Sequence, residues 1–158
     1  NLYSYLLSHK RKSILEKPKN MISKDKVGNL IENIVDAYKI NLTPEEFQKR
    51  RDELLIEPFK SCKFTKGARE TTHKCKYELG LKVGIATSSL KQDFENKTNH
   101  LKDWLNEDID LVVTTDDGRI KAGKPAPDIF ILAAKELGLE PQECIVFEDS
   151  SFGVKAAI

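Results

Sequence analysis

Near its C-terminal end the chain carries an apolar run that stops abruptly at two adjacent carboxylates. Residues 144–147 have the length and composition of a buried strand. Glu148 and Asp149 follow directly, and Ser150 and Ser151 can cap the helix that the small residues after them predict. Open α/β sheets bind ligands at the carboxyl ends of their parallel strands. A cation would keep both repelling carboxylates ionised; the alternative is a helix N-terminus whose acids suit the helix dipole.

Composition sets limits on what such a chain does. The 158 residues fit one domain, or a core with a small accessory unit. Because 26 Lys and Arg face 25 Asp and Glu, the net charge of +1 points to neither nucleic acid nor membrane as a partner. No apolar run is long enough to span a bilayer. Three widely spaced cysteines predict neither a disulfide framework nor a metal knuckle, so we expect reduced thiols and a cytoplasmic location: Cys62, Cys75 and Cys144.

Residues 1–65 predict helices only, and we expect them to form a separate α-helical domain. Thr43, Pro44 and Glu46 form a capping box that begins one helix, and we expect Pro58 to end it. Before it, six apolar residues share one face of a predicted helix: Val27, Leu30, Ile31, Ile34, Val35 and Tyr38.

The first residues predict another helix, and the chain's limits suggest a longer protein. Leu2, Leu6 and Leu7 lie on one helical side, and a Lys-rich loop is expected at 17–26. Asn1 stands where an initiator Met is usual, and the last predicted helix has only a turn or two before Ile158. We therefore expect the sequence to be an incomplete record.

The pattern changes near Gly67, so residues 66–158 are expected to be an α/β domain. A helix over 68–79 with Gly80 at its end leads to a buried strand over 81–86. A second strand is expected at 111–114, followed by an acidic turn and a small hairpin through Arg119 and Ile120.

Chemistry-bearing residues follow successive strands or loops of this domain. Three hydroxyl residues come after the first strand: Thr87, Ser88 and Ser89. Lys124 lies on a loop stiffened by two prolines before a helix expected over 129–137, and Glu148 and Asp149 come last. In a parallel sheet all three groups would meet at the carboxyl edge. Hydroxyl and ammonium donors suit a phosphoryl group, and carboxylates with Mg²⁺ neutralise it from the other side, as phosphoryl transfer requires.

Three segments resemble motifs II, III and IV of the haloacid dehalogenase (HAD) superfamily in order and spacing. They are Ile-Ala-Thr-Ser-Ser at 85–89, Gly-Lys-Pro-Ala-Pro-Asp-Ile-Phe at 123–130 and Val-Phe-Glu-Asp-Ser-Ser-Phe-Gly at 146–153. The helical unit resembles the α-helical cap of that superfamily. The stretch 86–98 is most similar to pseudouridine-5′-phosphatase-like members. This resemblance implies a Rossmann-like parallel-sheet core, incomplete in this sequence, with a small all-α cap.

The resemblance also implies roles for individual residues. Thr87 would hydrogen-bond the transferring phosphoryl group, with Ser88 and Ser89 beside it in substrate binding. Lys124 would offset charge on the phosphoryl oxygens and the nucleophile. Asp149 would hold Mg²⁺, and Glu148 would either ligate it or order a metal-bound water.

One part of the superfamily pattern is missing. The nucleophilic Asp and the acid–base Asp belong to a DxDG-type motif I on the first core strand, and this sequence has no such motif. We therefore expect that strand to lie upstream, further strands to follow Ile158, and these 158 residues alone to be inactive. The expected activity of the full-length protein is Mg²⁺-dependent hydrolysis of a small phosphorylated metabolite, such as a nucleotide or sugar phosphate, through an aspartyl-phosphate.

Other readings remain open at this point. A phosphomutase similar to β-phosphoglucomutase shares motifs II to IV and the helical cap. A non-catalytic HAD-like protein would bind only a phosphorylated ligand or a partner. Response-regulator receivers carry the same residue types, but their acids precede the hydroxyl and the lysine, so the order here argues against them. The sequence predicts no oligomeric state.

Overall fold

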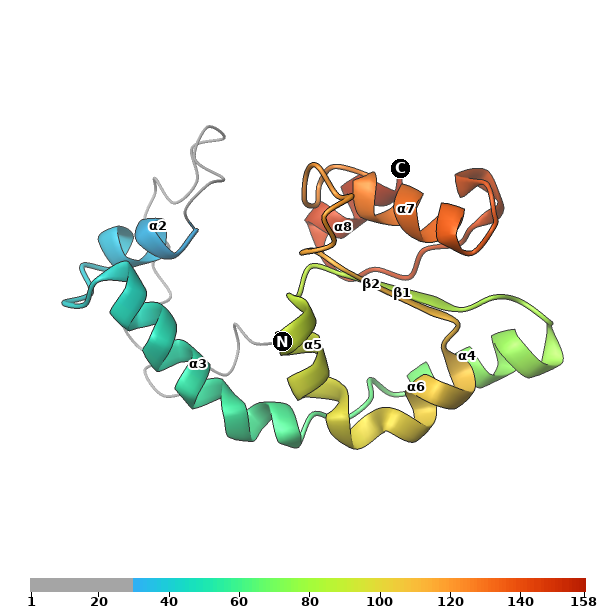
Figure 1. The fold of residues 1–158 in the computed structure, drawn as a ribbon, viewed down its shortest axis with the longest axis horizontal. Helices are drawn as coiled ribbons and strands as arrows, with labels where there is room; N and C mark the ends of the chain where they lie inside the picture. Colours follow the sequence, from blue (N-terminus) through green and yellow to red (C-terminus); the bar gives the residue numbers. More distant parts are fainter. Residues whose placement is uncertain (1–29) are drawn as a thin grey trace. The chain divides into compact units, whose positions relative to one another are not determined.

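The computed structural model describes residues 30–158, and its fold is drawn in Figure 1. The helix predicted around Leu2 and the loop predicted at 17–26 lie outside the described residues. Contacts divide the chain into two units, Asn1–Leu55 and Ile56–Ile158. This division falls earlier than the domain boundary predicted after residue 65, which stays a prediction.

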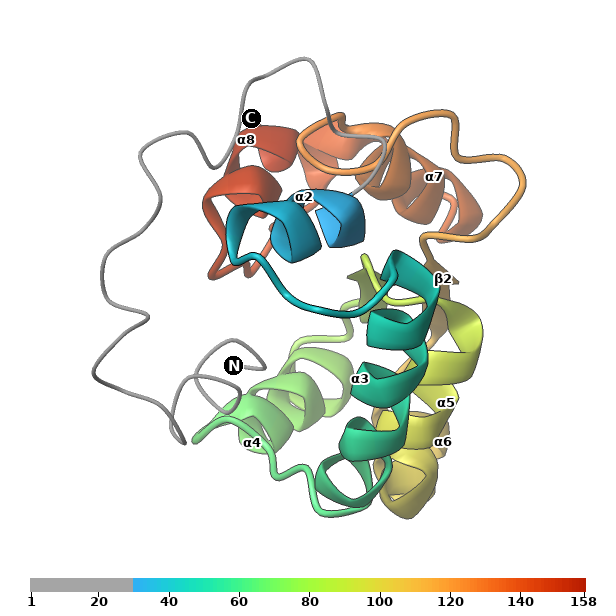
Figure 2. The ribbon, with the colours of Figure 1, turned by 90° about the vertical axis from the view of Figure 1, so that its left-hand side faces the viewer.

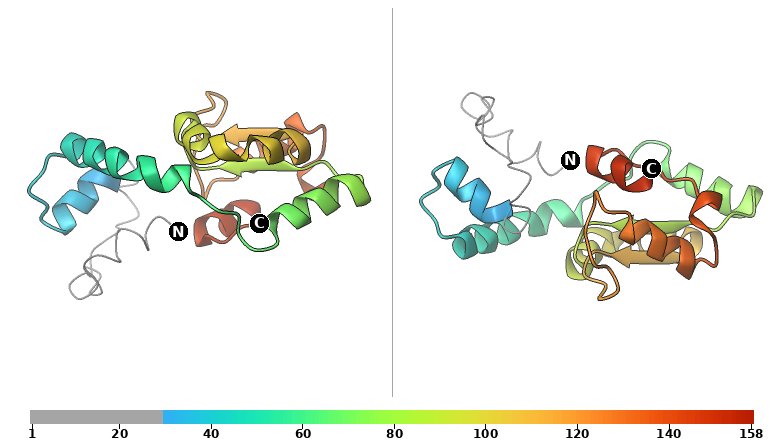
Figure 3. Two further views of the ribbon diagram at one scale, coloured as in Figure 1. Left: turned by 90° about the horizontal axis from the view of Figure 1, so that it is seen from below. Right: turned by 90° about the horizontal axis from the view of Figure 1, so that it is seen from above.

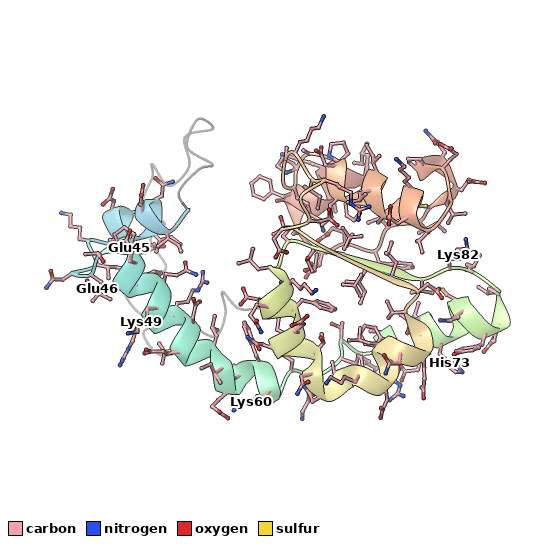
Figure 4. The ribbon with its side chains drawn as sticks, viewed as in Figure 1. Glu45, Glu46, Lys49, Lys60, His73 and Lys82 are labelled. Carbon is pink, nitrogen blue, oxygen red and sulfur yellow. The ribbon has the colours of Figure 1, made fainter. Side chains whose placement is uncertain are left out.

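Among its described residues, the first unit contains helices only. Helix α2 (Leu30–Ala37) is the predicted amphipathic helix, described from Leu30 onward, and it buries Val35. Helix α3 (Pro44–Lys60) begins at the predicted capping box: Thr43 Oγ1 accepts the Glu46 N–H at 3.2 Å, and the Glu46 carboxylate accepts the Thr43 N–H at 2.8 Å. Glu46 lies in the first turn of α3 (Figure 4). These reciprocal bonds satisfy two backbone donors that a helix start otherwise leaves unpaired.

The prediction that Pro58 ends this helix is wrong, because α3 continues to Lys60 with Pro58 inside it. A proline in a helix forfeits one backbone hydrogen bond, but its fixed φ is compatible with the helix. Phe59 is only 5% exposed, so its burial holds the last turn in place. The N–H groups of Ser61 and Cys62 then donate to the carbonyls of Pro58 and Phe59 at 3.3 and 3.4 Å and close the helix end.

The second unit is built on a small parallel sheet, as the sequence predicts. Strands β1 (Gly84–Thr87) and β2 (Leu111–Thr114) pair in parallel, with Thr87 opposite Thr114. The strand expected over 81–86 therefore starts three residues late. The reason lies at Val83, whose N–H donates to the Asp110 carboxylate at 2.8 Å instead of to a neighbouring strand. That bond and the Lys76 ammonium lower the pKa of Asp110.

Helices cover both sides of these strands. Helix α7 (Asp128–Glu136) packs on the sheet through Ile129 and Ala133, which form a buried core with Val113. Figures 1 and 2 show α5 (Lys91–Thr98) and α6 (Lys102–Asp108) on the opposite side, and Figure 3 shows each layer face-on. A 3-10 turn, η2 (Asn99–Leu101), separates α5 from α6. The helix expected over 129–137 is α7, displaced by one residue at each end.

The remaining helices are short. The helix expected over 68–79 is present as α4 (Ala68–His73) continued by a π-helical turn, η1 (Lys74–Glu78). Gly67 and Gly80 flank it with φ of 83° and 63°, a conformation that glycine adopts without strain. A 3-10 turn, η3 (Pro141–Glu143), follows α7, and α8 (Ser151–Ala157) begins at Ser150, whose Oγ accepts the Gly153 N–H at 2.9 Å.

Two expected β elements do not form. The predicted strand at 144–147 pairs with no other described segment, and its side chains Ile145 and Phe147 are 83% and 81% exposed. An extended run becomes a strand only where a neighbour accepts and donates its hydrogen bonds. The hairpin predicted through Arg119 is a turn instead, because the Asp117 carboxylate binds both the N–H and the guanidinium of Arg119. Those bonds lower the pKa of Asp117 to about 2.

The last turn of α3 and the segment that follows it contact the α5–α6 region. The Lys97 ammonium lies 4.7 Å from the centre of the Phe59 ring, and Phe64 meets Trp104 edge-on. The Trp104 indole N–H donates to Thr72 Oγ1 at 2.9 Å, and that hydroxyl donates to Asp108 at 2.9 Å. Asp108 is 1% exposed, so this network satisfies a carboxylate that burial would otherwise penalise.

We predict that Asp108→Ala lowers the free energy of unfolding by about 3 kcal/mol, because it removes the buried acceptor of Thr72 and of His73 on α4 (Figure 4). Chemical denaturation measures the change. Asp103→Ala, an exposed acid on the same helix, is the control and should cost less than about 0.5 kcal/mol. Equal effects of the two substitutions would contradict a stabilising role for the Asp108 network.

Candidate active site

Lys124 is held on a loop whose backbone is fixed by the first residue of α7. The Asp128 carboxylate accepts the N–H groups of Lys121 and Ala122, both at 3.1 Å. A side-chain oxygen that captures two consecutive N–H groups defines a tight turn. The loop that the prolines already stiffen therefore delivers Lys124 in one direction, towards the carboxyl edge of β1.

The Lys124 ammonium joins the three segments that the sequence predicts to converge. It donates to the carbonyl of Ala86, near the end of β1, at 3.2 Å and to Glu148 Oε2 at 2.6 Å. It also lies 4.5 Å from the centre of the Phe130 ring, within range of a cation–π contact. The Lys124 and Glu148 side chains are 10% and 14% exposed. Residues far apart in sequence thus form a largely buried ion pair at one sheet edge.

Both oxygens of Glu148 are occupied in this arrangement. Oε2 binds Lys124, and Oε1 accepts the Ser150 N–H at 3.1 Å. Burial by itself would raise the pKa of Glu148, but the bonds from Lys124 and Ser150 outweigh it, so the pKa lies below its ordinary value. Glu148 is therefore an ionised carboxylate that points inward. Because protein donors already bind both of its oxygens, it is better placed to orient the Lys124 ammonium than to ligate a metal ion directly.

Asp149 has the opposite environment. It is exposed, and within residues 30–158 no hydrogen bond or ion pair engages its carboxylate. No group of three His, Cys, Asp or Glu side chains in that range is arranged to hold a metal ion. Mg²⁺ binds proteins through one or two carboxylates, with waters and substrate phosphate completing its shell. The exposed Asp149 carboxylate fits such a ligand, and its predicted role in metal binding stays a prediction.

The three hydroxyl residues at the end of β1 lie at the same edge but differ in their contacts. Thr87 Oγ1 accepts the Ser89 N–H at 3.1 Å, which closes the turn. Ser89 Oγ accepts a hydrogen bond from Lys97 Nζ at 2.9 Å, and Ser88 is exposed. The predicted hydrogen bond from Thr87 to the transferring phosphoryl group and the predicted roles of Ser88 and Ser89 in substrate binding stay predictions.

A hollow of about 370 Å³ lies elsewhere on this unit, between α5 and the outer side of β2. Lys91, Thr114 and Asp116 are among its lining residues, whereas Thr87, Lys124 and Glu148 are not. It does not coincide with the convergence at Lys124. We take the converging side chains around Lys124, and not the hollow, as the candidate site. A bound ligand needs charged groups and hydrogen-bond donors as well as space.

Sequence reasoning missed three residues that shape this site: Lys97, Phe130 and Gly153. Lys97 lies in the stretch 86–98 noted for its resemblance, but its bond to Ser89 depends on how helix α5 folds back towards the end of β1. Phe130 and Gly153 lie inside quoted motifs, but their contacts with Lys124 and Glu148 depend on how α7 and α8 approach the sheet edge.

Comparison with known proteins identifies the family of this chain. The profile of the haloacid dehalogenase-like hydrolases matches residues 9–158, so the chain belongs to that family. A probable pseudouridine-5′-phosphatase of Saccharomyces cerevisiae is 37% identical over 132 residues, which are 78% of this chain and 55% of that protein. A phosphorylated carbohydrates phosphatase of Thermotoga maritima is 32% identical over 125 residues, 78% of this chain and 56% of that protein.

Solved structures show the same fold. The β-phosphoglucomutase of Clostridium difficile superposes with a TM-score of 0.60 at 28% identity, over 80% of this chain and 57% of that one. The family and the incomplete α/β core predicted from the motifs are thus confirmed. The chain spans about half the length of the curated relatives named here. None of the helices within residues 30–158 has the length and apolarity of a membrane span.

We predict that the Lys124–Glu148 pair is energetically coupled. Lys124→Met should cost about 2 kcal/mol of unfolding free energy, because it leaves Glu148 charged and unpaired in a largely buried place. In the double variant Lys124→Met/Glu148→Gln, much of the lost stability should return. Denaturation of the wild type, the two single variants and the double variant measures the coupling free energy. Lys121→Met, on the same loop but exposed, is the control. Strictly additive effects at Lys124 and Glu148 would show that the pair does not interact.

Proposed function

We propose that the full-length protein is a divalent-metal-dependent phosphatase that acts on a small phosphorylated metabolite through an aspartyl-phosphate intermediate. The observation that carries this proposal is the meeting of Lys124, the end of β1 and Glu148 at one sheet edge. The relatives named above are phosphatases of a phosphorylated nucleoside and of phosphorylated carbohydrates, which supports a metabolite of that size.

Each residue has a role that its surroundings support. Lys124 supplies a fixed positive charge at the end of β1, where a phosphoryl group would receive hydrogen bonds from Thr87 and Ser88. A preorganised charge stabilises the transition state because it does not have to reorient during the reaction. Glu148 keeps the Lys124 ammonium oriented. Asp149 would ligate Mg²⁺, which when bound neutralises phosphoryl oxygens as charge develops.

The nucleophile is proposed to lie outside the described residues, on a strand carrying the DxDG-type motif. Residues 144–147 support this, since their extended backbone has no partner among residues 30–158 and Ile145 and Phe147 are largely exposed. Parallel sheets in α/β proteins are normally covered on both faces, so a strand-like run with exposed apolar side chains lacks its neighbours. A strand added here would end at the edge where Lys124 and Asp149 lie.

A phosphomutase is the second candidate, favoured by the structural likeness to β-phosphoglucomutase. The two activities share the phosphoryl site and differ in what accepts the phosphoryl group. Release of inorganic phosphate indicates the phosphatase, and a rearranged sugar phosphate without phosphate release indicates the mutase.

We predict that full-length protein releases phosphate from members of a panel of phosphorylated nucleosides and sugars, and that EDTA abolishes and added Mg²⁺ restores this activity. Lys124→Ala and Asp149→Asn should each lower kcat/KM by about 100-fold or more, since each removes charge stabilisation of the transition state. Exposed residues of the same types serve as controls, and Lys121→Ala and Asp103→Asn should stay within about twofold. Wild-type turnover in both site variants would contradict the proposed function.

A further inference from the structure

Gly153 lies at the point where the Glu148 side chain folds back on helix α8. It is the third residue of α8 and is buried. A Cβ atom built on Gly153 would lie 2.0 Å from Cδ, 2.2 Å from Oε2 and 2.3 Å from Cγ of Glu148. All three distances are far below van der Waals contact, so the Glu148 carboxyl group occupies the space that any other residue at 153 would fill.

The Glu148 carboxyl group has little freedom to move aside. One oxygen is held by the Lys124 ammonium at 2.6 Å and the other by the Ser150 N–H at 3.1 Å. A Cβ at residue 153 would push the group away from its present place and therefore break at least one of these bonds. The backbone of residue 153 would be unaffected, because its N–H could still donate to Ser150 Oγ.

We propose that Gly153 is a positioning residue that decides which of the two adjacent carboxylates faces Lys124. By leaving room over α8, it lets Glu148 turn inward to the ammonium, while Asp149 stays exposed and free of protein partners among residues 30–158. Without that room the two acids compete for the same ammonium and the same solvent-facing position. The geometric part of this inference is independent of any activity, and its consequence for turnover rests on the proposed function.

Helix propensity predicts the direction in which Gly153→Ala would change stability if Glu148 were not in the way. Alanine is a better helix former than glycine, so Gly153→Ala should strengthen α8 locally unless the new methyl group meets an obstacle. Outside the neighbouring residues and the backbone of its own helix, the three atoms nearest to the added Cβ all belong to the Glu148 side chain. We therefore expect the substitution to act on Glu148 and to leave the fold in place.

The test is the coupling between Lys124 and Glu148, measured in full-length protein by denaturation of the Lys124→Met, Glu148→Gln and double variants. With Gly153 present, the coupling should correspond to a factor of about ten in the unfolding equilibrium constant. In a Gly153→Ala background, the coupling should correspond to a factor of less than about two. Gly118→Ala, where a built Cβ meets nothing within 4 Å, is the matched control and should keep the full coupling. Undiminished coupling in the Gly153→Ala background would overturn the proposal.

If Gly153→Ala is too unstable to study alone, a second comparison tests whether residue 153 acts through Glu148. In a Glu148→Ala background the obstacle is gone, so Gly153→Ala should be at least as stable as its parent. A loss of stability there would mean that residue 153 meets something other than Glu148, and the proposal would fail. In an active enzyme, Gly153→Ala should lower kcat no further once Glu148 is Ala. If no phosphatase activity is found, the two stability comparisons still judge the role of Gly153.

Discussion

The Lys124–Glu148 ion pair is the interaction on which the candidate site depends. An ammonium and a carboxylate that are both largely removed from water are costly to bury, and each is tolerated because the other is present. The pair also links the loop before α7, the end of β1 and the segment before α8, which are otherwise separate parts of the chain. Satisfying one buried charge therefore fixes how these three segments meet at the candidate site.

The two adjacent acids show how neighbouring residues of like chemistry are given different environments. Glu148 has both oxygens engaged and a lowered pKa, whereas the Asp149 carboxylate is exposed. The longer side chain is the one that can bend back over Gly153 to reach Lys124. This arrangement separates the task of orienting the ammonium from the proposed task of ligating a metal ion.

Sequence reasoning succeeded where local rules decide the structure. The capping box at Thr43 and the strand at Leu111–Thr114 follow from hydrogen-bonding and apolar patterns within a few residues. Prediction failed where contacts with distant parts of the chain determine the structure. The run at 144–147 has the composition of a strand, yet it needs a partner that residues 30–158 do not supply. Pro58 was expected to stop a helix that the burial of Phe59 extends.

The same distinction applies to the site. The order of hydroxyls, lysine and carboxylates predicted that their segments converge at one edge, because parallel strands place their carboxyl ends together. The bonds of Lys124 to the Ala86 carbonyl and to Glu148 join these segments, and the predicted roles of the side chains stay predictions. The partners of these groups were not predictable, since Lys97 and Gly153 act through the approach of helices α5 and α8. Side-chain contacts of this kind depend on tertiary packing, which no spacing within the chain encodes.

A crystal structure of the full-length protein tests the central claim most directly. We expect residues 144–147 to be paired with a strand from outside residues 30–158 that carries the nucleophilic Asp, with Lys124 still bonded to Glu148 and Asp149 facing the new carboxylate. Finding residues 144–147 unpaired, or Lys124 turned away from Glu148 into solvent, would contradict the assignment of this edge as the phosphoryl-transfer site.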